Sequence, residues 1–331
     1  MECSSLGSPL MRHSNAEPAF GTTVLETRGL TRSFGALCAV EELSLEVRAG
    51  EMFALVGPDG AGKTTTIRML CGILAPSGGT GTVLGFDILK EPDALKRRIG
   101  YLSQRFSLYG DLTIDENIEF FAEINEVYDY AERREELLEF TRLTPFRSRL
   151  AERLSGGMKQ KLALACTLIH TPKVILLDEP TTGVDPVSRR DFWGILQSLL
   201  KDGVTIIMST PYLDEAERCT RVAMMNKGRL MSVDTPDRLR SHMRGEILEL
   251  VTDRVREAGR ILRGQKGVLE VQAFGDRLHV VVPSAHTGGA AVESLLRRHD
   301  IAVAGRRTIP PSLENVFISL LAHTEQEEMQ S

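Results

Sequence analysis

Hydrophobic residues follow two rhythms in the first two thirds of the chain. Residues 24–49 alternate apolar and polar positions, which is typical of antiparallel strands with one face in water. Three short runs, inside 51–57, 174–180 and 204–210, are apolar almost throughout and are separated by stretches with helical spacing. Continuous apolar strands that alternate with helices predict an α/β fold with a sheet covered on both faces.

The helical pattern is longest between about Leu112 and Leu168. It predicts a helical subdomain at about residues 104–168, inserted between the first two continuous apolar strands. A glycine-rich turn at 78–81 introduces another exposed strand, and residues 222–234 resemble a pair of strands that closes the domain.

The pattern changes after about Arg244. Strand, helix, strand, strand, helix and strand patterns follow, which is the order of a small ferredoxin-like α+β domain, and a terminal helix comes last. We expect HTGGA, residues 286–290, to form a loop. The chain therefore divides into a flexible segment at 1–22, a first domain at 23–243, an accessory domain at 244–322 and a flexible tail at 323–331.

Composition and charge exclude some functions. The 331 residues carry a formal net charge of -5, which argues against a protein that coats nucleic acid. Five dispersed cysteines without a C-x-x-C pair indicate reduced thiols rather than a disulfide framework or a zinc site. No apolar run approaches the ~20 residues of a transmembrane helix, and the N-terminus lacks the apolar stretch of a secretory signal. Any work at a membrane is therefore expected from the water side, through partners.

The motif GPDGAGKT, residues 57–64, lies between a predicted strand and a predicted helix. It fits G-x-x-x-x-G-K-[ST], whose backbone N–H groups turn inward around phosphates. Lys63 can reach the β- and γ-phosphates, and the hydroxyl of Thr64 can bind Mg²⁺. The helix N-terminus adds its positive dipole end. The motif thus predicts ATP-binding residues at Gly57, Pro58, Asp59, Gly60, Ala61, Gly62, Lys63, Thr64 and Thr65.

Two carboxylates, Asp178 and Glu179, end the apolar strand VILLDEP. A structural role is disfavoured because an unpaired buried charge is costly. Next to a phosphate-binding loop, Asp178 is placed to hold Mg²⁺ and Glu179 to orient or deprotonate the attacking water. An apolar run ending in Asp-Glu is a weak signal alone, but together with the loop it predicts a nucleoside triphosphatase.

A second anion cradle is predicted at LSGGMKQK, residues 154–161. Ser155 can cap the following helix, and Gly156 and Gly157 expose backbone N–H groups. A plain capped helix is the simpler interpretation. Because one loop already binds the triphosphate, a second cradle makes sense if it serves a nucleotide held by another molecule.

In this order the three motifs resemble the nucleotide-binding subunits of ABC transporters, over roughly residues 24–240. The resemblance implies a P-loop NTPase (RecA-like) core with an antiparallel β-subdomain and a helical signature subdomain. It also implies two domains packed head to tail, with each ATP between one P-loop and the other domain's signature. Ser155 and Gly157 would then contact a γ-phosphate bound by the partner.

Three further positions match the family's pattern. Phe34 matches the aromatic residue that stacks on adenine, although a core phenylalanine is the alternative. Gln104 matches the glutamine that touches Mg²⁺ and relays to the membrane subunit. Asp185 matches an aspartate that crosses the dimer interface, or else it simply starts a helix before Pro186.

One position departs from the family. A switch histidine is expected at the strand end before YLDEAE, where this chain has Pro211, and neither His170 nor His242 lies at this strand end. A proline cannot donate to a γ-phosphate. Since Glu179 is present, we expect slowed but real hydrolysis of ATP. The alternative is a regulatory domain that binds ATP with little or no hydrolysis.

The C-terminal sequence PSLENVFISLL, residues 311–321, resembles the closing motif of ATPase subunits in drug- and antibiotic-exporting systems with ABC-2-type permeases. A generic amphipathic helix is the alternative. The similarity implies a subunit on the cytoplasmic face of the cell membrane that drives export of a drug-like or hydrophobic substrate. Implied partners are the permease, docked around Gln104 to Leu112, a second nucleotide-binding domain and a periplasmic adaptor protein, but no nucleic acid.

Other classes of ATPase fit the chain less well. Translation-type ABC proteins usually carry two cassettes in one chain, whereas one P-loop and one signature are found here. DNA-repair members have a long heptad-bearing insert that this sequence lacks. Small GTPases need an NKxD motif, which NKGR at 226–229 does not satisfy.

Overall fold

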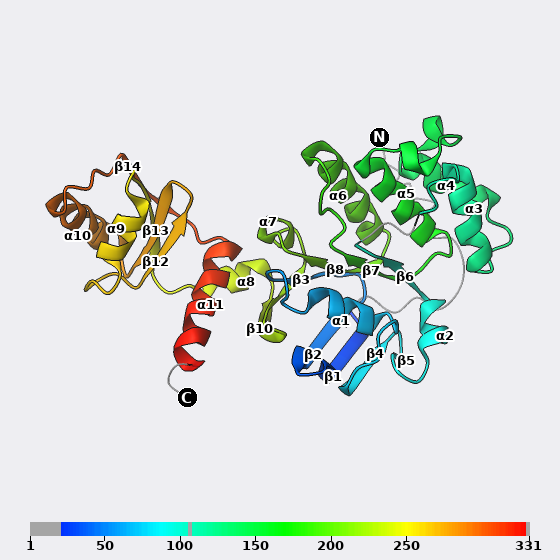
Figure 1. The fold of residues 1–331 in the computed structure, drawn as a ribbon, viewed down its shortest axis with the longest axis horizontal. Coiled ribbons are helices and arrows are strands. Elements are labelled where there is room, and N and C mark those ends of the chain that lie inside the picture. The colour runs from blue at the N-terminus through cyan, green and yellow to red at the C-terminus, as the bar shows by residue number, and fades with distance from the viewer. Residues whose placement is uncertain (1–20, 105–107, 329–331) are drawn as a thin grey trace, which may run out of the picture. The chain divides into compact units, whose positions relative to one another are not determined.

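The computed structural model describes residues 21–104 and 108–328, and contacts divide the chain into two units. The first unit ends at Val233 and the second begins at Asp234 (Figure 1). Most of the predicted flexible segment at 1–22 lies outside the described residues. Within the described part of the chain, no helix combines the length and apolar character needed to cross a membrane.

The first unit is built around a six-stranded sheet in the order β10-β9-β3-β8-β7-β6. The pairs β3–β8, β3–β9, β7–β8 and β6–β7 are parallel. Every residue of β3, β7 and β8 is buried, which confirms the predicted sheet covered on both faces. The strands are β3 (Met52–Val56), β6 (Ile99–Leu102), β7 (Val174–Asp178), β8 (Thr205–Thr210), β9 (Arg221–Asn226) and β10 (Arg229–Asp234).

A second, antiparallel sheet of the same unit has the order β2-β1-β4-β5. Its long hairpin shows the predicted alternation of buried and exposed positions, especially along β2. Apolar residues of this sheet and of the parallel sheet belong to one hydrophobic cluster, which fixes the two sheets relative to each other. The strands are β1 (Thr23–Phe34), β2 (Leu37–Arg48), β4 (Gly78–Val83) and β5 (Phe86–Asp87).

Helices cover the parallel sheet and form the predicted helical region (Figure 1). Helix α3 begins with a complete capping box, because Thr113 and Glu116 satisfy each other's backbone N–H groups. Helix α3 packs on α5, and α5 packs on α6. The helices are α1 (Lys63–Leu70), α2 (Pro92–Lys96), α3 (Ile114–Ile124), α4 (Ala131–Phe140), α5 (Gly156–Leu168), α6 (Pro186–Lys201) and α7 (Leu213–Ala216).

The second unit contains a four-stranded antiparallel sheet in the order β12-β13-β11-β14, which is the ferredoxin-like order. Helices α9 and α10 share a hydrophobic core with one face of this sheet. Helix α11 packs against α8 and β12. The elements are α8 (Pro236–Ser241), β11 (Glu246–Val251), α9 (Val255–Leu262), β12 (Glu270–Phe274), β13 (Arg277–Val282), α10 (Ala285–Arg298), β14 (Gly305–Ile309) and α11 (Leu313–Glu328).

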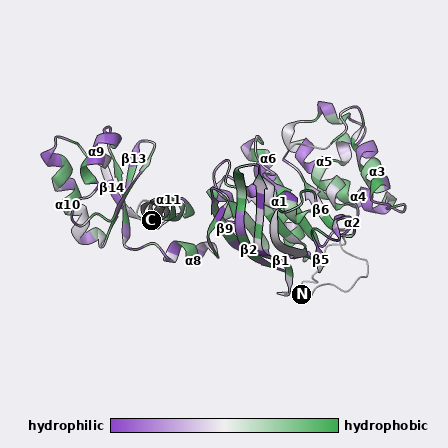
Figure 2. Cartoon of the chain, turned by 60° about the horizontal axis from the view of Figure 1, so that its bottom comes forward, coloured by the Kyte–Doolittle hydropathy of each residue, from purple (hydrophilic) through white to green (hydrophobic). Residues whose placement is uncertain are grey.

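Hydrophobic and hydrophilic residues follow one another along α3, α9 and α10 (Figure 2). This mixture is expected of helices that bury one face and expose the other. In α10 the buried positions are Gly289, Val292 and Leu296.

Three details of the second unit differ from the sequence-based expectation. Residues 286–290 are not a loop, because they form the first turns of α10, where an added Cβ on Gly288 would come within 2.8 Å of Val282. Residues 323–328, assigned by the sequence to a flexible tail, continue α11 to Glu328. The second unit also begins at Asp234, ten residues before the predicted boundary, since α8 contacts α11.

Candidate active site

The loop between β3 and α1 is held in a tight curve by two of its glycines. A Cβ added to Gly57 would lie 2.2 Å from the carbonyl oxygen of Met225. Gly62 has a φ of 97°, and its added Cβ would lie 2.5 Å from the carbonyl oxygen of Ala39. Any other residue would force the loop away from its neighbours, so the glycines fix the backbone at the start of α1.

Lys63 is buried at the first position of α1. Its Nζ donates to the carbonyl oxygens of Gly57 at 2.8 Å and of Pro58 at 3.0 Å. Nζ also lies 3.5 Å from Oε1 of Glu179, whose Oε2 accepts a hydrogen bond of 3.0 Å from the amide of Gln104. A chain of polar contacts thus joins the P-loop, the residue after β7 and Gln104, two residues after β6.

Asp178 is completely buried at the last position of β7. Its Oδ1 accepts from the hydroxyls of Thr64 at 2.9 Å and of Ser209 at 2.6 Å, whereas Oδ2 is buried with no hydrogen-bond partner. Burial, together with the charge of Asp178, raises the pKa of the Cys71 thiol. A buried carboxylate oxygen left free beside a threonine hydroxyl fits Mg²⁺, which prefers oxygen ligands.

Ser209 is a site residue that the sequence analysis missed. Its Oγ donates to Oδ1 of Asp178 and accepts from the backbone N–H of Glu179 at 3.0 Å, so one side chain on β8 holds the carboxylate of Asp178 and the backbone of Glu179. The sequence did contain one indication of this role, which is the position of Ser209 at the carboxyl end of a buried strand. In open α/β sheets, ligands bind at the edge formed by these strand ends.

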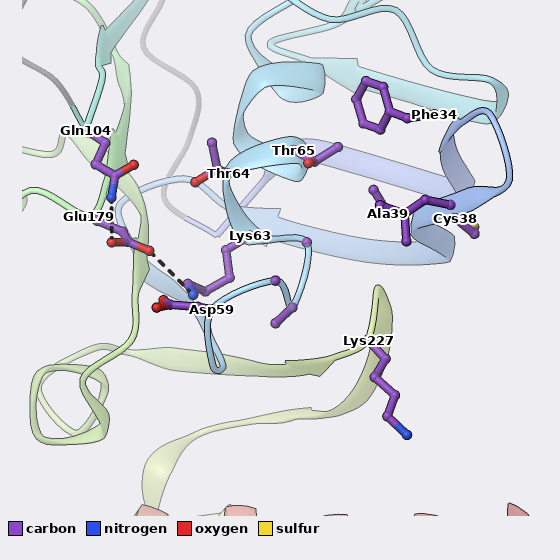
Figure 3. A pocket seen from close by; sticks show the side chains of 14 residues that line it. Phe34, Cys38, Ala39, Asp59, Lys63, Thr64, Thr65, Gln104, Glu179 and Lys227 are labelled. Carbon is purple, nitrogen blue, oxygen red and sulfur yellow. Dashed lines mark hydrogen bonds and ion pairs between the residues drawn. The ribbon is translucent and has the colours of Figure 1, made fainter.

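P-loop residues 59–64 and both ends of this chain of contacts line a cleft of about 590 Å³, whereas Gly57 and Pro58 do not line it. Figure 3 shows Phe34 at one end of the cleft, Gln104 and Glu179 at the other, and Thr64 and Thr65 between them. The Phe34 ring is 47% exposed, and the Arg32 guanidinium lies 4.6 Å from its centroid. The cleft is lined by Phe34, Leu37, Cys38, Ala39, Asp59, Gly60, Ala61, Gly62, Lys63, Thr64, Thr65, Gln104, Glu179 and Lys227.

The signature residues do not line this cleft. Ser155 caps α5 and accepts from the backbone N–H of Met158, and an added Cβ on Gly156 would meet nothing within 4 Å. Gly157 is packed tightly, because its added Cβ would lie 2.3 Å from Cβ and Oγ of Ser188. At the start of α5, Gly156 therefore has free space beside it, whereas Gly157 packs against α6.

Asp185 also lies outside the cleft, at the start of α6. Its carboxylate accepts the backbone N–H groups of Val187 and Ser188, and these bonds lower its pKa. Asp185 therefore starts a helix in this chain, with Pro186 in the first turn.

Pro211 follows the last residue of β8, next to the carboxyl ends of β3 and β7. It is half-buried and contributes neither a side-chain donor nor a backbone N–H. Its neighbour Tyr212 donates its backbone N–H to Thr210 Oγ1 at 3.1 Å.

A strand–loop–helix cradle backed by a buried acidic pair defines a P-loop NTPase. Comparison with known proteins narrows this class. Residues 40–182 match the family described as ABC transporter.

Two curated relatives and one solved structure illustrate the similarity. The probable multidrug ABC transporter ATP-binding protein YbhF of Escherichia coli K12 is 49% identical over 226 residues, or 67% of this chain and 39% of that protein. The daunorubicin/doxorubicin resistance ATP-binding protein DrrA of Streptomyces peucetius is 36% identical over 93% of this chain and 94% of its own length. A dimeric structure of the cassette MJ0796 with ADP and phosphate is 25% identical, with a TM-score of 0.58 over 64% of this chain and 98% of that chain.

The chain therefore belongs to the family of ATP-binding subunits of ABC transporters. It spans about two fifths of the length of YbhF and nearly the whole length of DrrA.

Proposed function

We propose that this chain binds and hydrolyses ATP and thereby powers export through a separate ABC-2-type permease. The contact chain Lys63–Glu179–Gln104, with the free buried oxygen of Asp178 behind it, carries the hydrolytic part of the proposal. Relatives named for multidrug transport and for daunorubicin resistance support export, and a drug-like or hydrophobic substrate.

The chain's own residues supply binding and activation of water. Backbone N–H groups of residues 57–64 and the start of α1 bind the phosphates, and Lys63 pairs with their charge. Phe34 stacks on the adenine at the far end of the cleft. Glu179, held between Lys63 and Gln104, orients and deprotonates the attacking water.

Magnesium fits the remaining groups. Thr64, Asp178 and Gln104 would hold it, since the hydrogen bond from Gln104 to Glu179 uses the amide nitrogen and leaves the amide oxygen. When bound, Mg²⁺ neutralises charge on the phosphates.

A second nucleotide-binding domain is needed in this proposal. Ser155, Gly156 and Gly157 lie outside the cleft of their own chain, and the exposed start of α5 is suited to the γ-phosphate of a partner's nucleotide. The relative MJ0796, dimeric with ADP and phosphate, supports this arrangement. Asp185, at the start of the neighbouring helix α6, would face the same partner.

The permease would dock next to Gln104. A small hollow of about 30 Å³ is lined by mostly apolar residues that include Tyr101, Leu108, Phe121 and Cys166. Of the predicted docking segment 104–112, residues 105–107 lie outside the described structure. With a permease there, the subunit would work at the cytoplasmic face of the membrane, and a periplasmic adaptor would complete an export system. Nucleic acid is not an expected partner, given the net charge of -5.

Pro211 favours a second candidate function, an ATP-binding regulatory domain with little hydrolysis. Pro211 contributes no donor to the γ-phosphate, and removal of one charge-stabilising donor slows reactions that use an oxyanion hole by about 10²-fold. Because Glu179 keeps its contacts, we favour slow hydrolysis over none.

ATP turnover by the purified full chain separates the two candidates. Glu179→Gln should reduce turnover by about 10²-fold or more while ATP binding persists, and Pro211→His should raise turnover. If Glu179→Gln leaves turnover unchanged, the proposed hydrolytic site is wrong. Co-purification with a co-expressed permease tests the transport part independently.

A further inference from the structure

The proposed water-activating residue sits on a strained turn. Glu179 has a φ of 48°, a left-handed conformation that costs a non-glycine residue on the order of 1 kcal/mol and persists only when the surroundings impose it. On its N-terminal side, the backbone N–H of Glu179 is bound by Ser209. Within the turn, the Thr182 hydroxyl donates to Glu179 Oε2 at 3.3 Å. The C-terminal side needs a separate restraint.

Glu215 supplies that restraint. It lies on the short helix α7, four residues after Pro211, and only 1% of its surface is exposed. One carboxylate oxygen accepts from the hydroxyl of Thr181 at 2.5 Å, and the other accepts from the hydroxyl of Thr210 at 2.8 Å. A single side chain therefore ties the turn after β7 to the end of β8.

Arginine on a third element completes the cluster. Arg189 of α6 places Nε 3.5 Å from Glu215 Oε1, and its guanidinium lies 4.6 Å from the ring centroid of Tyr212. Burying the carboxylate of Glu215 costs free energy, and an apolar residue of similar volume would fill the same space without that cost. The hydroxyls of Thr181 and Thr210 are themselves buried and need acceptors, and the Glu215 carboxylate supplies one to each.

We infer that Glu215 is a positioning residue for Glu179. It does not line the cleft. Instead it fixes Thr181, two residues beyond Glu179, and so keeps the strained turn from relaxing. Through its two hydrogen bonds, Glu215 links the turn after β7 to Thr210, the last residue of β8. The inference rests on the proposed hydrolysis of ATP.

Thr181→Val is the sharpest test, because it removes one hydroxyl at nearly constant volume. A misplaced base slows hydrolysis without weakening ATP binding, so kcat should fall by about 10- to 100-fold with KM for ATP within about twofold. Thr181→Ser should restore kcat. The matched control is Thr141→Val in α4's C-cap, another buried threonine, whose hydroxyl bonds Leu137 O at 2.6 Å; it should leave kcat unchanged.

A double substitution separates positioning from general support of the fold. If Glu215 and Thr181 act through Glu179, then Thr181→Val or Glu215→Gln should slow a Glu179→Gln chain no further. Losses that multiply would overturn the inference, as would an unchanged kcat in Thr181→Val. Wild-type turnover is measured first, since a chain without any hydrolysis refutes the proposed function itself and the inference with it.

Discussion

Asp178 in the first unit and Glu249 in the second are both carboxylates with less than a tenth of their surface exposed. Glu249 Oε1 accepts from Arg307 at 2.6 Å and from Arg277 at 3.0 Å, and these bonds lower the pKa of Glu249 to about 2. Asp178 receives two hydroxyls on one oxygen and nothing on the other. A carboxylate whose charge is paired with two guanidinium groups holds a structure together, whereas a buried carboxylate with one oxygen left without a hydrogen-bond partner is open to a ligand.

Of the substitutions that test this comparison, Asp178→Asn should have the largest effect, which is a loss of ATP hydrolysis. The amide keeps an acceptor for Thr64 and Ser209 but removes the free anionic oxygen. Mg²⁺-dependent hydrolysis of ATP should fall by at least about 10²-fold. The melting temperature measured without Mg²⁺ should not fall, because an unpaired buried charge has been removed. A large loss of stability would mean that Asp178 is structural after all.

Glu249→Gln should show the opposite pattern. Neutralising the acceptor weakens its bonds to Arg277 and Arg307, although both arginines are exposed enough to rehydrate. We expect a loss of about 1 kcal/mol, or roughly 4–8 °C for a unit of this size, seen as faster hydrogen exchange in residues 246–282. Trp193, the one tryptophan, is buried in the first unit, so its fluorescence melt and ATP turnover are the controls and should not change.

The smallest effect concerns pH and His279, next to Glu249 in the sheet of the second unit. Burial lowers the pKa of His279, whose Nε2 lies 3.5 Å from Glu249 Oε2 and whose Nδ1 lies 2.9 Å from the amide nitrogen of Asn315 on α11. Below the ordinary pKa of 6.5 the unfolded chain gains a proton that the folded unit resists, so stability falls as pH drops.

The slope from His279 cannot exceed about 1.4 kcal/mol per pH unit, the limit for one proton. Glu249 adds a further loss below pH 4.5, since its pKa is also lower in the folded unit. Urea titrations at pH 7.5 and 5.5, followed by circular dichroism, measure the first effect, and His279→Gln is its control. A second unit more stable at pH 5.5 would contradict a lowered pKa of His279 in the folded unit.

Local sequence patterns were enough for the parallel sheet and the P-loop. Both are determined by neighbouring residues, since five consecutive apolar residues in β3 indicate a buried strand and the P-loop has a fixed motif. Residues 286–290 were different, since their two glycines indicate a loop although the segment is helical. An added Cβ on Gly288 would come within 2.8 Å of Cβ of Val282, the last residue of β13, so packing of the helix on the strand requires this glycine.

The site divides in the same way. Lys63, Asp178 and Glu179 were identified from motifs, and the cleft brings Lys63 and Glu179 together with Gln104. Ser209, Thr181 and Glu215 were missed because their importance lies in hydrogen bonds between β7, β8 and α7. No spacing along the chain reveals that Glu215 meets Thr181, which lies 34 residues earlier.

The contact between Gly157 and Ser188 limits which sequences this fold can accept. Helices α5 and α6 meet there with no room for a Cβ at position 157, so any side chain added to one helix must be matched by a loss on the other. The two positions are therefore constrained jointly. The signature motif is usually explained by the nucleotide that it binds, but at Gly157 it is also constrained by packing against Ser188. Substitutions at position 188 are in turn limited by Gly157, 31 positions earlier in the chain.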